Sequence, residues 1–327
     1  MSYIVVTGGA GFIGSGLIWG LNQRGFDNII VTDVLGTDEK WKNLANLRFA
    51  DYFEKDDFLT KLQAGDFAGQ IDGIIHMGAC SATDERDISY LMNNNFGDTK
   101  RLAQWSIDNS KRFVYASSAA TYGNGEKGFS DSHDGLDTLK PINGYAFSKW
   151  QFDLWAKRKG VLNKMAGLKF FNVFGPNEYH KDGMRSVVNK AYDEIKATGG
   201  MKLFKSDHPD FGDGGQSRDF VYIKYVVDAT LAVYNAKDAN GIFNLGTGVA
   251  RSFKDLTVAT FQAMGLEPNI SYIDMPDKFK GKYQYYTCAE MEKLRKVYPD
   301  MPWTLEESVK DYVQNYLMQD DGYLKVQ

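Results

Sequence analysis

The chain has 327 residues, of which 43% are hydrophobic and 24% charged, and its formal net charge is −4. This length can bury a large core in one α/β unit or two lobes, and the charge balance gives no basic footprint for nucleic acid and no polybasic tail for a membrane. The two cysteines form neither a disulfide framework nor a metal-ligand spacing, and no apolar run suits a signal peptide or a membrane span. We therefore expect a cytoplasmic protein without a metal site.

The first predicted element is a short apolar strand over residues 3–6, which breaks at a glycine-rich turn and restarts as a helix. Gly9, Gly11 and Gly14 match G-x-G-x-x-G, and Gly8, Gly11 and Gly14 match G-x-x-G-x-x-G. Such glycines allow a tight turn, close approach to a pyrophosphate and close packing of helix on strand. Asp33 follows the next predicted strand, where this pattern expects a ribose-binding carboxylate. The segment predicts a dinucleotide site.

Strand and helix patterns alternate through the first half of the chain. Strands are expected at 28–32, 44–50, 73–76 and 111–116, and helices at 16–24, 58–64 and 90–109. This alternation is typical of a doubly wound parallel Rossmann sheet, here followed by a smaller C-terminal substrate-binding lobe. We expect the dinucleotide-binding domain to take residues 1–171 and 222–250, and the lobe to take 172–221 and 251–327.

Candidate site residues follow the predicted strands, because ligands on such sheets bind beyond the carboxyl ends of the strands. This rule selects residues 76–81, the pair Ser117 and Ser118, and Asn172. Farther along, Tyr145 and Lys149 are four residues apart and so share one helix face. A cation beside a phenol lowers the pKa of the phenol, which predicts an acid/base at Tyr145.

Five motifs together resemble the extended short-chain dehydrogenase/reductases that act on nucleotide sugars. The motifs are residues 7–14 (TGGAGFIG), 117–123 (SSAATYG), 145–149 (YAFSK), 172–176 (NVFGP) and 218–222 (RDFVY). The resemblance covers nearly the whole chain. It implies that Tyr145 is the acid/base, that Lys149 grips the nicotinamide ribose and that Ser118 orients the reacting hydroxyl.

Within this superfamily the chain resembles the ADP-glyceromanno-heptose 6-epimerase family. The similar segments are residues 76–81 (HMGACS), 116–123 (ASSAATYG), 177–181 (NEYHK) and 279–284 (FKGKYQ). The resemblance implies an ADP-sugar substrate, tightly bound NADP, transient oxidation of the heptose at the 6-position in lipopolysaccharide core heptose biosynthesis, and a homopentamer. It also implies a second acid/base at Lys181, whose alternative is a solvated lysine in an acidic loop. Residues 182–186 read DGMRS where the family has GSMAS, so the contacts just after Lys181 depart from the pattern.

The choice of cofactor depends on the charges around Asp33, which by itself repels a 2′-phosphate and favours NAD. The heptose epimerase resemblance implies NADP, with Lys40 and Lys55 offsetting the acid and Val34 in place of an asparagine. We expect NADP, with NAD as the alternative. The expected cofactor contacts are Gly8, Gly11, Phe12, Ile13, Gly14, Asp33, Val34, Lys40, Lys55, His76, Met77, Gly78, Ala79, Cys80, Ser81, Asn94, Lys149, Val173 and Lys181.

Several of these residues have simpler alternatives. Asn94 is either a cofactor contact or a helix-surface amide, and Cys80 is expected to line the cofactor and not to act as a nucleophile. The histidines His76, His133 and His208 are expected to be structural and not catalytic.

The substrate contacts are expected at Ser118, Asn172, Gly183, Lys190, Phe204, Lys205, Ser206, Arg218 and Tyr283. Arg218 is predicted to clamp the pyrophosphate, because a planar guanidinium matches phosphate oxygens bidentately. The alternative is a structural ion pair with Asp219.

Three other functions are alternatives to the heptose epimerase. A nucleotide-hexose 4-epimerase using NAD shares every motif except the loop of Lys181. A 4,6-dehydratase needs an acidic pair where this chain has Ala119 and Ala120, which disfavours it. A non-enzymatic dinucleotide sensor on the same fold typically lacks the tyrosine, whereas Tyr145 and Lys149 are both present.

Overall fold

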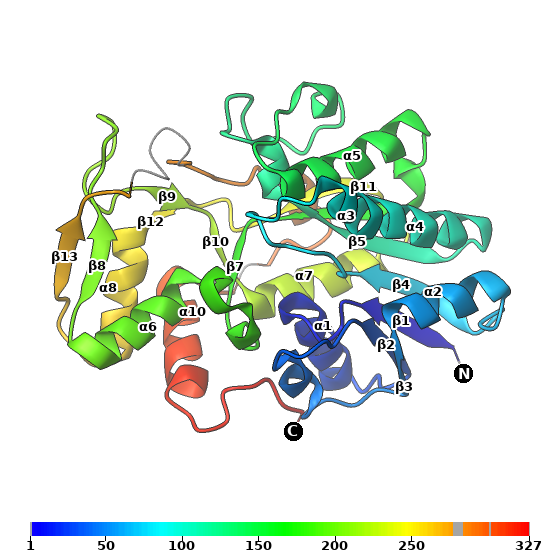
Figure 1. The fold of residues 1–327 in the computed structure, drawn as a ribbon, viewed down its shortest axis with the longest axis horizontal. Coiled ribbons are helices and arrows are strands. Elements are labelled where there is room, and N and C mark those ends of the chain that lie inside the picture. The colour runs from blue at the N-terminus through cyan, green and yellow to red at the C-terminus, as the bar shows by residue number, and fades with distance from the viewer. Residues whose placement is uncertain (1, 277–283, 301, 327) are drawn as a thin grey trace.

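The computed structural model describes residues 2–276, 284–300 and 302–326. Its largest element is a seven-stranded sheet of order β11-β6-β5-β4-β1-β2-β3, in which every pair is parallel (Figure 1). The strands are β1 (Tyr3–Thr7), β2 (Ile29–Asp33), β3 (Asp51–Glu54), β4 (Ile71–His76), β5 (Arg112–Ser118), β6 (Ala166–Phe170) and β11 (Gly241–Leu245). The strand order reverses between β1 and β4, which is where ligands bind on doubly wound sheets. The predicted fold class is confirmed.

Helices lie over both faces of the sheet (Figure 1). The helices of this part are α1 (Phe12–Gln23), α2 (Lys55–Ala64), α3 (Ile88–Leu91), α4 (Asp98–Asp108), α5 (Gly144–Arg158) and α7 (Ile223–Asn235). On one face α1 packs closely on α7, because Gly20 leaves room for Val227; a Cβ at Gly20 would lie 2.2 Å from a methyl group of that valine. Between the helices, β1, β2 and β4 are built from β-branched residues that are almost completely buried, as expected of parallel strands.

Two predicted elements differ from the structure. The strand expected at 44–50 is wrong: a 3-10 turn over Lys40–Leu44 leads into an irregular segment, and the strand is β3 at the sheet edge. The apolar spacing misleads there because Leu44 and Leu47 are buried without being in a strand. The helix expected at 90–109 is interrupted by a π-helical segment, Met92–Gly97, between α3 and α4.

A smaller lobe lies beside the sheet, at the left of Figure 1. Its elements and the short pairs that join it to the sheet are β7 (Asn172–Phe174), α6 (Val187–Thr198), β8 (Met201–Phe204), β9 (Ser217–Arg218), β10 (Phe220–Tyr222), β12 (Arg251–Ser252), α8 (Phe253–Ala263), β13 (Ile270–Ile273) and α10 (Leu305–Tyr312). The short helix α9 (Glu292–Arg295) packs against β11 of the large sheet. The lobe has its own apolar cluster, formed by Ala191, Ile195, Met201, Leu203 and Phe261. The chain enters the lobe after β6 and returns through α7 to β11, and the domain boundaries given above stay a prediction.

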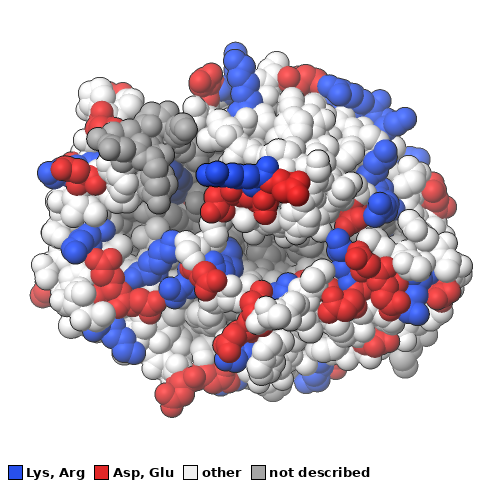
Figure 2. Space-filling model, viewed as in Figure 1, with Lys and Arg blue, Asp and Glu red and all other residues white. Residues whose placement is uncertain are grey.

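The surface carries acidic and basic side chains interspersed over the face drawn in Figure 2. Among the described residues, no helix is long and apolar enough to cross a membrane. The same residues contain no cluster of three or more histidine, cysteine or acidic side chains that could hold a metal ion.

Candidate active site

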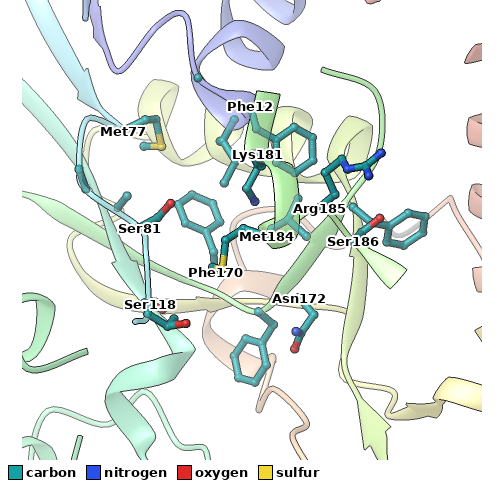
Figure 3. Close-up of a pocket in the computed structure, with 18 of the residues that line it drawn as sticks. Phe12, Met77, Ser81, Ser118, Phe170, Asn172, Lys181, Met184, Arg185 and Ser186 are labelled. Atoms are coloured by element: carbon teal, nitrogen blue, oxygen red, sulfur yellow. The ribbon is translucent and has the colours of Figure 1, made fainter. Parts of the chain in front are cut away.

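A cavity of about 790 Å³ lies at the carboxyl ends of the central strands, within the size range of small-molecule sites. Its walls come from the glycine-rich turn, the ends of β4 and β5, the first turns of α5 and the segment before α6 (Figure 3). A smaller cavity of about 200 Å³ adjoins it between β2, β4 and α4. The sheet therefore brings together segments that are far apart in the sequence.

The glycine-rich turn is shaped for close backbone approach. Gly8 has φ +63° and lies against Gly78, so a Cβ there would be 2.6 Å from the Gly78 backbone. A Cβ at Gly14 would lie 2.0 Å from the carbonyl oxygen of Gly8. Gly11 precedes α1 without any side-chain cap, so the first amides of the helix face the cavity as donors for an anion. The turn fits a dinucleotide pyrophosphate.

Asp33, at the end of β2, is held between the turn and a lysine. Its Oδ2 accepts from the amide of Ala10 at 2.9 Å, and its Oδ1 lies 2.8 Å from Lys40 Nζ. Lys55 reaches the same smaller cavity and donates to Asn94 Oδ1 at 2.9 Å and to Asp98 Oδ2 at 3.0 Å. Asn94 therefore lines a cavity and holds a lysine, which argues against a plain helix-surface amide.

The segment after β4 borders both cavities, with Met77, Gly78, Ala79 and Ser81 at the larger one and Cys80 at the smaller one. His76 is buried and its two ring nitrogens contact Thr7 at 2.6 Å and Thr99 at 2.8 Å. Burial lowers the pKa of His76 to about 3, so the ring is neutral and structural, as expected.

The other two histidines named in the sequence also have structural contacts. His133 Nε2 accepts from the amide of Ile242 at 3.0 Å, and His208 Nδ1 accepts from the amide of Asp210 at 3.3 Å. Neither lines the larger cavity.

Tyr145 and Lys149 both line the larger cavity from α5, whose start is fixed by Asn143 accepting from the amide of Ala146 at 2.8 Å. Burial raises the pKa of Tyr145, and its interaction with Ser118 opposes the rise. The expected lowering of the pKa of this phenol is thus wrong, because burial has the larger effect. Lys149 Nζ donates to the carbonyl of Ala116 at 2.8 Å. Burial lowers the pKa of Lys149 to about 8. Tyr145 is therefore a neutral phenol that can donate a proton. Lys149, one turn farther along α5, is a cation that loses its proton as the pH rises through about 8.

Two buried side chains that the sequence patterns do not single out support this pair. Asp153, one turn beyond Lys149, accepts from Ser117 Oγ at 2.7 Å and from the Tyr115 hydroxyl at 2.9 Å. The sequence does contain a signal for Asp153, because Tyr145, Lys149 and Asp153 are spaced four residues apart and so share one face of α5. Asn95, in the π-helical segment, exchanges two 2.9 Å hydrogen bonds with the backbone of Cys80 and donates to Ser148 at 3.0 Å. No motif points to Asn95.

Lys181 reaches the cavity from a later segment of the chain, the 3-10 helix Tyr179–Met184. This helix is kinked at Asp182 (φ 44°). Its amine lies 5.2 Å from the centroid of the Phe12 ring, and Figure 3 shows the two side chains together. Burial lowers the pKa of Lys181, and Glu178 opposes the fall. A partly buried, easily deprotonated lysine at the glycine-rich turn fits an acid/base and not a solvated surface lysine.

Asn172, Val173, Lys190 and Arg218 also line the larger cavity, as the sequence predicts. The guanidinium of Arg218 lies 5.5 Å from the centroid of the Phe253 ring. The carboxylate of Asp219 accepts instead from the Thr247 amide and hydroxyl and from the amides of Gly248 and Ala289. This arrangement supports the clamp interpretation of Arg218 over the ion pair.

Four predicted substrate contacts are not brought to the cavity, namely Gly183, Phe204, Lys205 and Ser206. Lys205 directly follows β8, is exposed and pairs with Asp274 at 3.0 Å. Tyr283 lies outside the described residues. The substrate roles of these five residues stay a prediction. The sequence patterns did not single out Phe170, Met184, Arg185, Ser186 and Phe253, which line the cavity.

The chain is similar to a known protein family and to several named proteins. Residues 4–246 match the model of the NAD dependent epimerase/dehydratase family. The chain is 51% identical over 321 residues to an ADP-L-glycero-D-manno-heptose-6-epimerase of Nitratidesulfovibrio vulgaris, covering 98% of this chain and 99% of that protein. It is 46% identical over 331 residues to the Fusobacterium nucleatum protein of that name, covering 98% and 100%. The crystal structure of the Helicobacter pylori protein of that name superposes with a TM-score of 0.80 at 27% identity, over 96% of each chain.

Proposed function

Because the chain belongs to the NAD dependent epimerase/dehydratase family, we propose that it converts ADP-D-glycero-D-manno-heptose into ADP-L-glycero-D-manno-heptose. The chain is an isomerase, and its relatives with this name match it over nearly their full length. The observation that carries the proposal is a cavity bordered by two acid/base side chains from different elements, Tyr145 and Lys181. One acid/base group cannot serve both faces of a planar ketone unless the sugar turns over, so two such groups suit inversion at one carbon.

The protein binds a nicotinamide dinucleotide, for which the glycine-rich turn, Asp33 and the segment after β4 provide the contacts. When bound there, the cofactor would supply reversible hydride transfer at carbon 6 of the heptose, so that the sugar would undergo no net oxidation. Gly8 and Gly14 let the backbone approach the pyrophosphate. Lys149 provides a cation that lines the cavity together with Tyr145 and Ser118.

The chain's own residues move the proton of the 6-hydroxyl. Tyr145, next to Ser118, exchanges this proton on one face of the ketone, and Ser118 holds the oxygen by hydrogen bonding. Lys181 exchanges the proton on the other face, and burial lowers the pKa of its amine, which favours such an exchange. Arg218 lines the same cavity, and its guanidinium fits the diphosphate of the ADP group.

Within the nicotinamide dinucleotides, NADP is the cofactor that the charges favour. Lys40 is paired with Asp33 and Lys55 with Asp98, and both amines border the smaller cavity, where they can turn to a 2′-phosphate. The test is to denature the purified protein and identify the released nucleotide by mass spectrometry. Released NADP supports the proposal, whereas NAD alone would overturn it and favour the hexose 4-epimerase.

The reaction is tested by NMR with ADP-D-glycero-D-manno-heptose, with UDP-galactose in parallel and no added cofactor. Conversion of the heptose to its L-glycero epimer is the expected result. Turnover of UDP-galactose alone would move the substrate to a hexose, and no turnover of either with nucleotide still bound would favour the sensor. The Tyr145→Phe variant is the matched blank, because it keeps the cavity and removes one hydroxyl.

The same proposal assigns the protein to lipopolysaccharide core heptose biosynthesis in the cytoplasm and to a homo-oligomer, a pentamer by family resemblance. Light scattering of the purified protein measures the oligomer directly, and a monomeric mass would overturn that part.

A further inference from the structure

Asn177, four residues before Lys181, joins four distant segments of the chain. It is fully buried, at 0% exposure, and has φ +77°. Its side-chain amide donates to Ser15 Oγ in α1 at 2.9 Å, and its side-chain oxygen accepts from the amide of Leu324 at 2.9 Å. Its backbone carbonyl accepts from Asn43 Nδ2 at 3.0 Å. The loop of Lys181 is thereby tied to α1, to the 3-10 turn and to the C-terminal tail.

These bonds end at the turn that the Lys181 amine faces. Ser15 Oγ also donates to the carbonyl of Phe12 at 3.2 Å, and the ring of Phe12 is the one beneath Lys181 Nζ. Asn43 Nδ2 donates in addition to the carbonyl of Ala10 at 2.8 Å. The contacts form a closed circuit, because the segment that carries Lys181 is bonded to Ser15 directly and to Ala10 through Asn43.

The C-terminal tail, residues 318–326, covers this circuit. The Tyr179 hydroxyl, two residues before Lys181, donates to the carbonyl of Gly322 at 2.6 Å. Trp19 Nε1 in α1 donates to the carbonyl of Lys325 at 3.2 Å, and Leu324 is 1% exposed. The tail therefore contacts both the lysine loop and the helix that follows the glycine-rich turn.

We propose that Asn177, Asn43 and Ser15 form an amide clamp that positions Lys181 against the glycine-rich turn, and that the C-terminal tail closes this clamp. The proposal rests on the function proposed above and deepens it. All three are positioning residues, because none lines either cavity. Positioning is needed here because the lysine sits on a short kinked 3-10 segment and not on a long helix, and a misplacement of about 1 Å can cost about 100-fold in rate.

The test variant is Asn177→Gly, which deletes the side chain and tolerates the positive φ. We expect kcat for the heptose to fall roughly 10- to 100-fold with KM and nucleotide content nearly unchanged. The matched control is Asn22→Ala, which removes a buried side-chain amide of α1 that is bonded to the carbonyls of Phe26 and Arg48. This control loses a comparable set of hydrogen bonds and should keep kcat.

A double-mutant cycle separates positioning from general loss of structure. If the clamp acts through Lys181, adding Asn177→Gly to Lys181→Met should lower kcat by less than twofold. If the full penalty of Asn177→Gly persists in the Lys181→Met background, the clamp does not act through this lysine and the proposal is overturned.

A labelling measurement does not depend on catalysis. The proteins are treated with acetic anhydride without substrate, and modification of Lys181 is followed by peptide mass spectrometry against the exposed Lys202. We expect Lys181 to be labelled several-fold faster in Asn177→Gly than in the wild type or Asn22→Ala. Equal rates in all three proteins would overturn the clamp. If the wild type does not convert the heptose, only the proposed function is contradicted. The labelling rates still test the clamp in that case, because they do not depend on turnover.

Discussion

The two sides of the active site are positioned in different ways. On the cofactor side, the glycine-rich turn and Asp33 sit at the ends of buried parallel strands, and their shape is dictated by close backbone contacts such as that of Gly14 with Gly8. On the substrate side, Lys181 is placed by side-chain bonds between distant segments, such as that of Asn177 with Ser15. The cofactor side is therefore encoded locally, and the substrate side depends on tertiary contacts.

The strongest way to break the cofactor side is Gly14→Ala. The new Cβ would lie 2.0 Å from the carbonyl oxygen of Gly8, so the turn must open and bound nucleotide should be lost completely. The measurement is the nucleotide released on denaturation. Gly135→Ala is the control, because no atom lies within 4 Å of the added Cβ and its φ is −85°. Full nucleotide content in Gly14→Ala would contradict the fit of the turn.

Tyr145→Phe should remove the acid/base without disturbing either side. We expect kcat to fall about 10³-fold, in the range of lost general acid–base catalysis, with nucleotide content kept. Tyr272→Phe, in β13, is a control with the same chemical change away from the cavity. A variant with a near wild-type rate would remove Tyr145 from the mechanism.

Lys181→Met and Lys205→Met sharpen the comparison within the substrate side. Lys181 lies over Phe12, so we expect a loss of about 100-fold in kcat, whereas Lys205 is exposed beside Asp274 and should cost less than twofold. Steady-state kinetics on the heptose measures both. Equal losses would mean that the lobe moves Lys205 to the substrate, and an active Lys181→Met would favour the hexose 4-epimerase.

The smallest expected effect is a shift in pH dependence. Burial lowers the pKa of Lys149 to about 8, so activity that needs the charged amine should fall as the pH rises through that value. The Asp153 carboxylate raises the pKa of Lys149, so Asp153→Asn should move this fall to lower pH. The profile of kcat against pH measures the shift. A shift to higher pH would contradict the sign.

The contrast between the two sides also explains what the sequence predicts. Alternating strands, the glycine spacing and the four-residue step from Tyr145 to Lys149 are local patterns. The strands form the sheet, and the glycine-rich turn and the Tyr145–Lys149 pair border the cavity at the carboxyl ends of its strands. The strand expected at 44–50 fails because buried leucines serve an irregular segment as well as a strand. Asn95 and Asn177 escape prediction because their partners lie in other elements, which no local pattern reveals.

The π-helical segment Met92–Gly97 has a consequence for how this fold tolerates change. Such a segment accommodates one residue more than a regular helix would hold, and here it turns Asn95 toward Cys80 and Ser148. Removing one residue from 92–97 would restore a regular helix and leave α3 and α4 in nearly the same orientation, but the wide turn that directs Asn95 would be lost. The amide would leave its partners while α4 kept its length. Single-residue gaps in relatives should therefore avoid this segment wherever the cofactor is retained.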